Sequence, residues 1–351
     1  MTSNLLAVGN ALALTRPRLR APRMVALGGG TGLPVLLRGL KDCLERDGHS
    51  RSAVVRDRLT AIVTMADDGG SSGRLRRDYG MLPPGDIRNC LLALAGAGSL
   101  ADLFDHRFNG HGEISGHNLG NLILTALSQM ETRFEQAVEK AGDLLAVWGR
   151  VLPATTTSVR LVADFEDGSR VVGESGIATA RRRIRRVFLD PGRPPALPQA
   201  LEAISAADCI VIGPGSLYTS IIPVLLVEGV AEAIAASGAR VVVVMNLMTE
   251  PGETDGLTAR DHLVALRAHA PALPVHDVIV NRSSVPAPLR QRYEAERAYP
   301  LAPGTRAIRA LGCRPCAGDM LWDGPRIRHD PDKLARAVVR LAGQPRPVGR
   351  L

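Results

Sequence analysis

Short runs of apolar, mostly β-branched residues alternate along the chain with longer stretches whose apolar positions recur at helical spacing. The runs are residues 25–27, 59–65, 210–212, 241–245 and 277–280, and each ends in polar or glycine-rich sequence. Runs of this kind are typical of strands that are buried on both faces of a sheet. Because helical stretches lie between them, we predict a Rossmann-like α/β fold with a mainly parallel sheet and helices on both faces.

One region departs from this alternation, because it has helical periodicity and almost no strand pattern. It covers residues 83–148 and predicts a helical insertion after the second strand. Its first helix begins at Pro84-Gly85-Asp86, where Asp86 is a candidate N-cap. Another helix begins at residues 116–118.

A small β excursion is predicted after the insertion. Residues 158–165 and 169–173 flank Glu166-Asp167-Gly168, a sequence that favours a hairpin with an Asp-Gly turn. Residues 330–341 have the pattern of a last helix. The predicted organisation is a single domain over 24–343, a mobile N-terminal extension over 1–23 and a flexible tail over 344–351.

Two of the predicted strands end in glycine-rich turns that lead into apolar sequence. The first turn follows residues 25–27 and the second follows residues 210–212; their candidate residues are Gly29, Gly30, Thr31 and Gly32, and Gly213, Gly215 and Ser216. Bare amides at the start of a helix can bind an anion, so both turns are candidate phosphate-binding groups. The first turn has neither the spacing of a dinucleotide fingerprint nor the lysine of a P-loop. Tight packing of the turn is the alternative interpretation.

A pair of carboxylates, Asp67 and Asp68, ends the second predicted strand and precedes Ser71 and Ser72. A carboxylate at this place suits ribose hydroxyls, and adjacent carboxylates near phosphates also suit Mg²⁺. Asp67 is therefore the candidate magnesium ligand. The alternative is a helix N-cap followed by a solvated turn.

Polar residues also gather at the predicted helix starts of the insertion and in one long loop. Asn118 and Asn121 are three residues apart, so on a helix they share a face. His117 is a candidate ligand contact or cap, since no nucleophile with a partnered carboxylate surrounds it. The loop that begins at Asn246 leaves the end of a predicted strand, where ligands bind in open α/β sheets. The remaining candidates of the first insertion helix are Arg88 and Asn89.

The net charge of the chain adds little evidence about its binding partners. The net charge is +8, from 43 basic and 35 acidic residues, but aromatic residues are only 3%. Only three of the basic residues are lysines, which indicates a bias toward arginine over the whole chain. The densest cluster lies at residues 181–186, and we interpret it as a solvated face because stacking residues are scarce around it. Contact with RNA or a membrane surface is the alternative.

The expected location is the cytoplasm. Five cysteines are too few and too scattered for a disulfide framework, and no apolar run reaches the roughly 18 residues of a membrane span. Cys313 and Cys316 form a single C-x-x-C, for which a zinc or redox role is the minor alternative. The sequence predicts no nucleic-acid partner and no membrane insertion, and a homo-oligomer stays open.

Several ordered motifs between residues 25 and about 265 resemble the YvcK family of gluconeogenesis factors, within the CofD-like group that includes 2-phospho-L-lactate transferase. The matching stretches are GGGTGLPVLLRGLK, ADDGGSSGRLR, PPGDIRNCLLALA, LFDHRF, GHNLGNL, VIGPGSLYTSIIP and NLMTEPGETDG. Val224 departs from the family pattern, which usually has Asn there.

The resemblance implies a Rossmann-like fold that binds a nucleotide or nucleotide sugar, with UDP-N-acetylglucosamine as the ligand associated with YvcK-like members. It implies that the two glycine turns and Asn246 line the phosphates, and that Asp67 matches a carboxylate linked to Mg²⁺ and catalysis in the transferase branch. Asn118 and Asn121 match a motif that faces a second-substrate pocket. Their companions there are Asp68, Ser71, Ser72, Arg88, Asn89 and His117.

Three hypotheses follow. The leading one is a cytosolic nucleotide-sugar-binding regulator linked to cell shape and gluconeogenic carbon metabolism, which the loop after Asn246 favours. The second is a transferase that moves a phospholactyl-type group from a nucleoside diphosphate to an acceptor hydroxyl, with Mg²⁺ at Asp67. The third, a nucleic-acid-binding protein, rests on charge alone.

Overall fold

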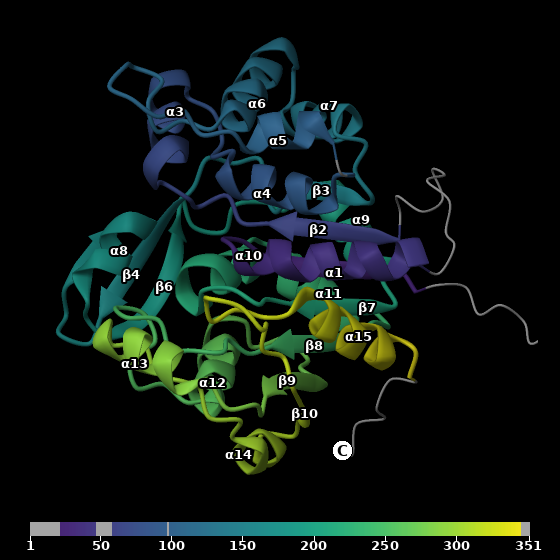
Figure 1. The fold of residues 1–351 in the computed structure, drawn as a ribbon, viewed down its shortest axis with the longest axis vertical. Helices are drawn as coiled ribbons and strands as arrows, with labels where there is room; N and C mark the ends of the chain where they lie inside the picture. Colours follow the sequence, from purple (N-terminus) through teal and green to yellow (C-terminus); the bar gives the residue numbers. More distant parts are fainter. Residues whose placement is uncertain (1–21, 47–57, 97, 345–351) are drawn as a thin grey trace, which may run out of the picture.

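The computed structural model describes residues 22–46, 58–96 and 98–344. The extension predicted for residues 1–23 lies almost wholly outside this part of the chain, and so does the tail predicted for residues 344–351. The helices and strands discussed below all belong to the described residues (Figure 1).

A seven-stranded parallel sheet forms the centre of the fold, in the order β10-β9-β8-β7-β1-β2-β3. Its strands are β1 (Met24–Gly28), β2 (Leu59–Val63), β3 (Arg150–Pro153), β7 (Cys209–Ile212), β8 (Arg240–Val244), β9 (Asp277–Asn281) and β10 (Arg314–Gly318). All five strand predictions are confirmed, as is the parallel α/β fold class. The strands β1, β2, β7 and β8 are buried along their whole length, as their continuous apolar sequences require.

The two edge strands, β3 and β10, were not predicted. Their sequences, Arg-Val-Leu-Pro and Arg-Pro-Cys-Ala-Gly, contain proline and have no long β-branched run. Proline is tolerated at a sheet edge because one side of the strand needs no partner. Cys316 lies on β10, and no disulfide bond joins any of the five cysteines in the described residues.

Helices cover both faces of the sheet. On one face α1 (Gly32–Arg46) packs against α15 (Pro331–Ala342) and α4 (Gly85–Leu94). The other face carries α9 (Pro198–Ser205), α10 (Ile222–Leu225), α11 (Val230–Ala236), α12 (Ala259–His269) and α14 (Thr305–Ala310). The helix α13 (Ala287–Ala295) has no buried residue. The predicted last helix is confirmed as α15.

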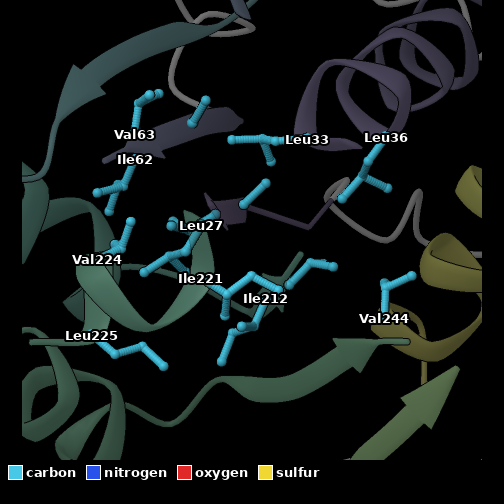
Figure 2. Close-up of a cluster of buried hydrophobic side chains, with 14 of the residues drawn as sticks. Leu27, Leu33, Leu36, Ile62, Val63, Ile212, Ile221, Val224, Leu225 and Val244 are labelled. Atoms are coloured by element: carbon cyan, nitrogen blue, oxygen red, sulfur yellow. The ribbon is translucent and has the colours of Figure 1, made fainter. Parts of the chain in front are cut away.

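The hydrophobic core lies between the central strands and the elements that follow the two glycine turns. Figure 2 shows Leu27 and Ile212 of the sheet between Leu33 of α1 and Val224 of α10. Val224 is 0% exposed, so the position where the family pattern has Asn is filled here by an apolar core residue. Burying such a side chain contributes roughly 1.5–3 kcal/mol.

The helical insertion and the β excursion are both confirmed. The predicted insertion over 83–148 contains α4, α5 (Ser99–Asp105), α6 (Leu119–Met130) and α7 (Phe134–Leu144). A further helix that was not predicted, α3 (Gly70–Tyr79), precedes them, and the five helices form the upper part of Figure 1. The excursion is a three-stranded antiparallel sheet of β4 (Arg160–Phe165), β5 (Arg170–Val172) and β6 (Ile184–Asp190), with α8 (Glu174–Ala180) beside it. In Figure 1 this small sheet lies near the carboxyl end of β2.

Candidate functional site

The two glycine turns meet where the strand order of the sheet reverses. β1 lies between β7 and β2, so the turns after β1 and β7 are neighbours at the carboxyl edge. A Cβ on Gly32 would lie 2.4 Å from the carbonyl oxygen of Pro214. The first turn therefore packs directly on the second, and crevices at such reversals are where ligands bind in open α/β sheets.

A cavity of about 580 Å³ opens over the two turns. Six of the eight predicted phosphate-binding residues line it: Gly30, Thr31, Gly32, Gly215, Ser216 and Asn246. The other two, Gly29 and Gly213, are buried outside its lining. A Cβ on Gly29 would lie 2.5 Å from Thr64 and from Asp86, so glycine is needed there for close packing rather than for approach to a ligand.

Asn246 holds the second turn in place. Its amide nitrogen donates to the carbonyl oxygen of Gly215 at 2.9 Å, and its side-chain oxygen accepts from the Gly215 amide at 3.3 Å. The same nitrogen donates to Glu250 at 3.2 Å. Asn246 thus shapes the cavity wall, and the loop that it begins is tied to the turn through these bonds.

Asp86 binds the first turn, which corrects the prediction that it caps a helix. α4 begins at Gly85 with Pro84 in the N-cap position, whereas Asp86 accepts a 2.7 Å hydrogen bond from the Gly30 amide. Burial, and next the charge of Asp67, raise the pKa of Asp86 to about 7. The Gly30 amide is therefore occupied by a protein carboxyl group.

A second group of predicted residues forms a buried hydrogen-bond network between α3 and α6. Ser71 Oγ lies 2.8 Å from His117 Nδ1, and Asn121 donates to the same Ser71 oxygen at 3.0 Å. Burial, and next the charge of Arg74, lower the pKa of His117. Asn121 donates to Ser71, and which of Ser71 and His117 donates in the bond between them depends on the tautomer of the imidazole.

Several polar atoms in this network have no hydrogen-bond partner among the described residues. They include the side-chain oxygens of Asn118 and Asn121 and the Arg88 Nε. Asn118 donates to the carbonyl of Asp105 at 3.1 Å, and Arg88 donates to the Asn89 oxygen. Buried polar atoms without partners are uncommon in proteins and mark places where a polar ligand or water binds.

The remaining predicted residues support neighbouring segments. Ser72 accepts from the Gly85 amide at 3.1 Å, which ties α3 to α4. Asp67 accepts from the Gly69 amide at 2.8 Å. Asp68 accepts from both the amide and the hydroxyl of Ser175 at 2.9 Å, which attaches α8 to the end of β2.

The sequence analysis missed the C-terminal wall of the cavity. Arg326, Arg328 and His329 line the same cavity as the glycine turns. The Arg328 guanidinium stacks on Trp322 at 3.6 Å from the ring centre. Burial lowers the pKa of His329 to about 4, so this side chain is neutral near pH 7. These residues follow the last recognisable motif, and no local pattern distinguishes them from other arginines in an arginine-rich chain.

Comparison with known proteins agrees with the fold. The family model for the 2-phospho-L-lactate transferase CofD matches residues 24–321. The chain belongs to the CofD family. A putative gluconeogenesis factor from Nostoc is 46% identical over 95% of this chain and 72% of its own length, and the gluconeogenesis factor of Bacillus subtilis is 44% identical over 91% and 98%. A crystal structure of a UPF0052 family protein from Bacillus halodurans matches with a TM-score of 0.85 and 42% identity, covering 92% of this chain and 99% of the other.

Further buried carboxyl groups interact electrostatically with Asp67 or with one another. Burial, followed by the charges of Asp67 and Asp86, raises the pKa of Glu174 to about 9. Burial raises the pKa values of Glu250 and Glu253 as well. None of these three acids was predicted as a site residue: Glu174 begins α8, and Glu250 and Glu253 lie together in the loop that begins at Asn246.

No set of three or more His, Cys, Asp or Glu side chains in the described residues is arranged to hold a metal ion. Mg²⁺ is commonly bound through one or two carboxylates, with phosphates and water completing its shell. Asp67 fits that mode as one carboxylate ligand, and a ligand phosphate would have to supply the rest. No helix in the described part of the chain is both long and apolar enough to cross a membrane.

Proposed function

We propose that this CofD-family protein binds a nucleotide sugar of the UDP-N-acetylglucosamine type and acts as a cytosolic regulator linked to cell shape and gluconeogenic carbon metabolism. The observation that carries the proposal is the cavity of about 580 Å³ that both glycine turns and two arginines line together. Its volume falls within the roughly 300–1,000 Å³ range of small-molecule sites.

The arginines of the cavity wall suit a diphosphate, and the same wall also contains the acidic residues Glu250 and Glu296. The Thr31 and Ser216 hydroxyls lie on the glycine-turn side, and Arg326 and Arg328 lie in the C-terminal wall. Guanidinium groups bind phosphate oxygens through charge-assisted hydrogen bonds, which are the stronger class of hydrogen bond. Because Asp86 occupies the Gly30 amide, we place the phosphates nearer the second turn and the arginines.

The names of the most similar relatives support a regulator over an enzyme. Proteins that are 42–44% identical over 91–93% of this chain are gluconeogenesis factors from Bacillus, Halalkalibacterium and Listeria. This is the branch that the loop after Asn246 indicated.

One observation favours a transferase as the second candidate. The buried network of Ser71, His117 and Asn121 has oxygen atoms without partners, which suits a second polar substrate. In such an enzyme the network would orient an acceptor hydroxyl, and Asp67 would hold Mg²⁺. The ion would neutralise the negative charge of the diphosphate.

Titration calorimetry with UDP-N-acetylglucosamine tests the binding proposal. Gly215→Val adds methyl groups where the phosphates approach, although its Cβ itself meets only ordinary contacts, the nearest at 3.4 Å. We expect this variant to lose at least about tenfold in affinity, as should Arg328→Gln. Gly238→Val is the matched control, since a Cβ there meets nothing within 4 Å.

Equal affinity in the wild-type protein, Gly215→Val and Arg328→Gln would contradict the proposal. Separate incubation with a nucleoside diphosphate donor and an acceptor hydroxyl, followed by product analysis, distinguishes the regulator from the transferase. Binding without turnover supports the regulator, and turnover that His117→Ala abolishes supports the second candidate.

A further inference from the structure

A second cavity, of about 340 Å³, lies on the opposite side of the loop that follows β8. We call it the arginine pocket; it is lined by Arg181, Arg182, Arg183, Ile184, Tyr218, Pro251, Gly252, Glu253, Asp255, Leu257 and Arg297. Pro251 is the one residue that lines both this pocket and the nucleotide cavity. The loop therefore separates two distinct cavities.

Four arginines from two distant parts of the chain converge on this pocket. Arg182 donates to Ser169 Oγ at 2.8 Å and pairs with Asp167 at 3.4 Å, and Arg183 pairs with Glu166 at 3.3 Å. Within the described residues, the guanidinium groups of Arg181 and Arg297 have no such partner. Two of the four charges are thus available to an anion.

The acidic residues of the pocket wall accept hydrogen bonds from neighbouring residues. Glu253 accepts a 2.9 Å hydrogen bond from the Thr219 hydroxyl, and Asp255 accepts from the Gly252 amide at 2.6 Å. The bond to Glu253 holds the loop against the π-helical turn (Leu217–Ile221), and the bond to Asp255 lies within the loop. Neither carboxylate forms an ion pair with Arg181 or Arg297 among the described residues.

The backbone at the two unpaired arginines is also unusual. Arg181 has φ of 48° and Arg297 has φ of 67°, both in the left-handed region that disfavours side chains with a Cβ. A glycine at either position would remove this strain. Arg181 is the C-cap of α8 and Arg297 follows the C-cap of α13, and a left-handed residue commonly ends a helix, so glycine variants suit the backbone at both positions.

We propose that the arginine pocket binds a small phosphorylated ligand, separately from the nucleotide cavity. The phosphate lies between the guanidinium groups of Arg181 and Arg297, each of which can offer two parallel N–H donors to phosphate oxygens. The volume admits a ligand of sugar-phosphate size, at the lower end of small-molecule sites. The sequence analysis interpreted residues 181–186 as a solvated face, and the pocket gives Arg181 a different role.

Titration calorimetry with glycerol 3-phosphate and with inorganic phosphate tests the site on the full chain. Arg181→Gly and Arg297→Gly remove the guanidinium groups and relieve the backbone strain, so both variants should keep or raise the melting temperature. We expect each to weaken binding by about tenfold, and the double variant to abolish it. Arg193→Gly is the matched control, because Arg193 has φ of 54° and lies outside the pocket.

Binding measurements on these variants either support or overturn a phosphate site in the arginine pocket. Binding that persists in the Gly215→Val variant but is lost in the double arginine variant supports the proposal and separates it from the nucleotide cavity. Binding lost in Gly215→Val places the phosphate in the nucleotide cavity, and unchanged affinity in the double variant removes the arginines from the site. Either result overturns the proposal, as does an absence of binding for both probes. Arg297→Asn, which also suits the left-handed backbone, repeats the test independently.

Discussion

Replacing Asp86 with Asn tests the electrostatics of the first glycine turn. The Asp86 carboxyl is buried beside the Gly30 amide, and its pKa rises from 3.8 to about 7. At 1.36 kcal/mol per pH unit, this rise corresponds to about 4 kcal/mol against the ionised carboxylate in the folded state. Asn resembles the neutral acid in shape and hydrogen bonding, so Asp86→Asn should be more stable than the wild-type protein at every pH at which Asp86 of the unfolded chain is ionised.

The sign follows from the protons bound in each state. Between pH 4 and pH 7 the folded protein retains the Asp86 proton that the unfolded chain has lost, so the stability of the wild-type protein falls as pH rises through this window. Below pH 4 both states are protonated and the variant gains nothing. Above pH 7 the difference reaches its full size, which we expect to be about 2–4 kcal/mol in favour of Asp86→Asn.

Urea unfolding at a series of pH values from 4 to 8 measures this difference directly. Glu232→Gln, an exposed carboxylate on α11, is the control and should leave the pH dependence unchanged. If Asp86→Asn had the same stability profile as the wild-type protein across the series, the carboxyl would not be the buried, destabilising group that its surroundings indicate. A loss of stability at pH 8 would also refute the reasoning.

Three further predictions concern the turns, the metal and the surface. Gly32→Ala should lower the free energy of unfolding by at least about 2 kcal/mol in urea titrations, because its Cβ would lie 2.4 Å from a carbonyl oxygen of the second turn; a neutral result would contradict the packing. If Asp67 holds Mg²⁺, chelation should weaken nucleotide-sugar binding in the wild-type protein and hardly at all in Asp67→Asn, and equal calorimetric binding with and without Mg²⁺ would leave Asp67 without a metal role. Oligonucleotide binding at near 0.15 M salt should be no tighter than micromolar, and it should be lost when Gln replaces Arg182, Arg183 and Arg185. Submicromolar binding would revive the nucleic-acid hypothesis.

The sequence predicted the centre of the fold better than its edges. β1, β2, β7 and β8 are buried on both faces, so their composition is uniformly apolar and easy to detect. The edge strand β10 has an exposed or half-buried pattern and contains Pro315, so neither periodicity nor β-propensity marks it. Its strand conformation depends on pairing with β9, which is a tertiary contact.

The residues of the candidate site also fall into two groups: those that a local sequence pattern reveals and those that only the folded chain brings together. Gly32 and Gly215 could be found because a strand, a glycine turn and a helix follow one another locally. Arg326 and Arg328 reach the same cavity from the far end of the chain, through the folding of the segment before α15. Such convergence leaves no local pattern in a sequence with many arginines.

The two glycine turns look equivalent in sequence, yet the structure gives them different chemistry. Asp86, 56 residues away from Gly30, takes the amide that the first turn would offer to a phosphate, and it brings a carboxyl group whose ionisation would repel that phosphate. The second turn is instead bound by Asn246, a neutral amide, which also donates to the buried carboxyl group of Glu250. Because like charges repel most strongly where water is excluded, we expect the ionised form of Asp86 to disfavour a phosphate at the Gly30 amide. The guanidinium groups of Arg326 and Arg328, which line the same cavity, should favour a phosphate there.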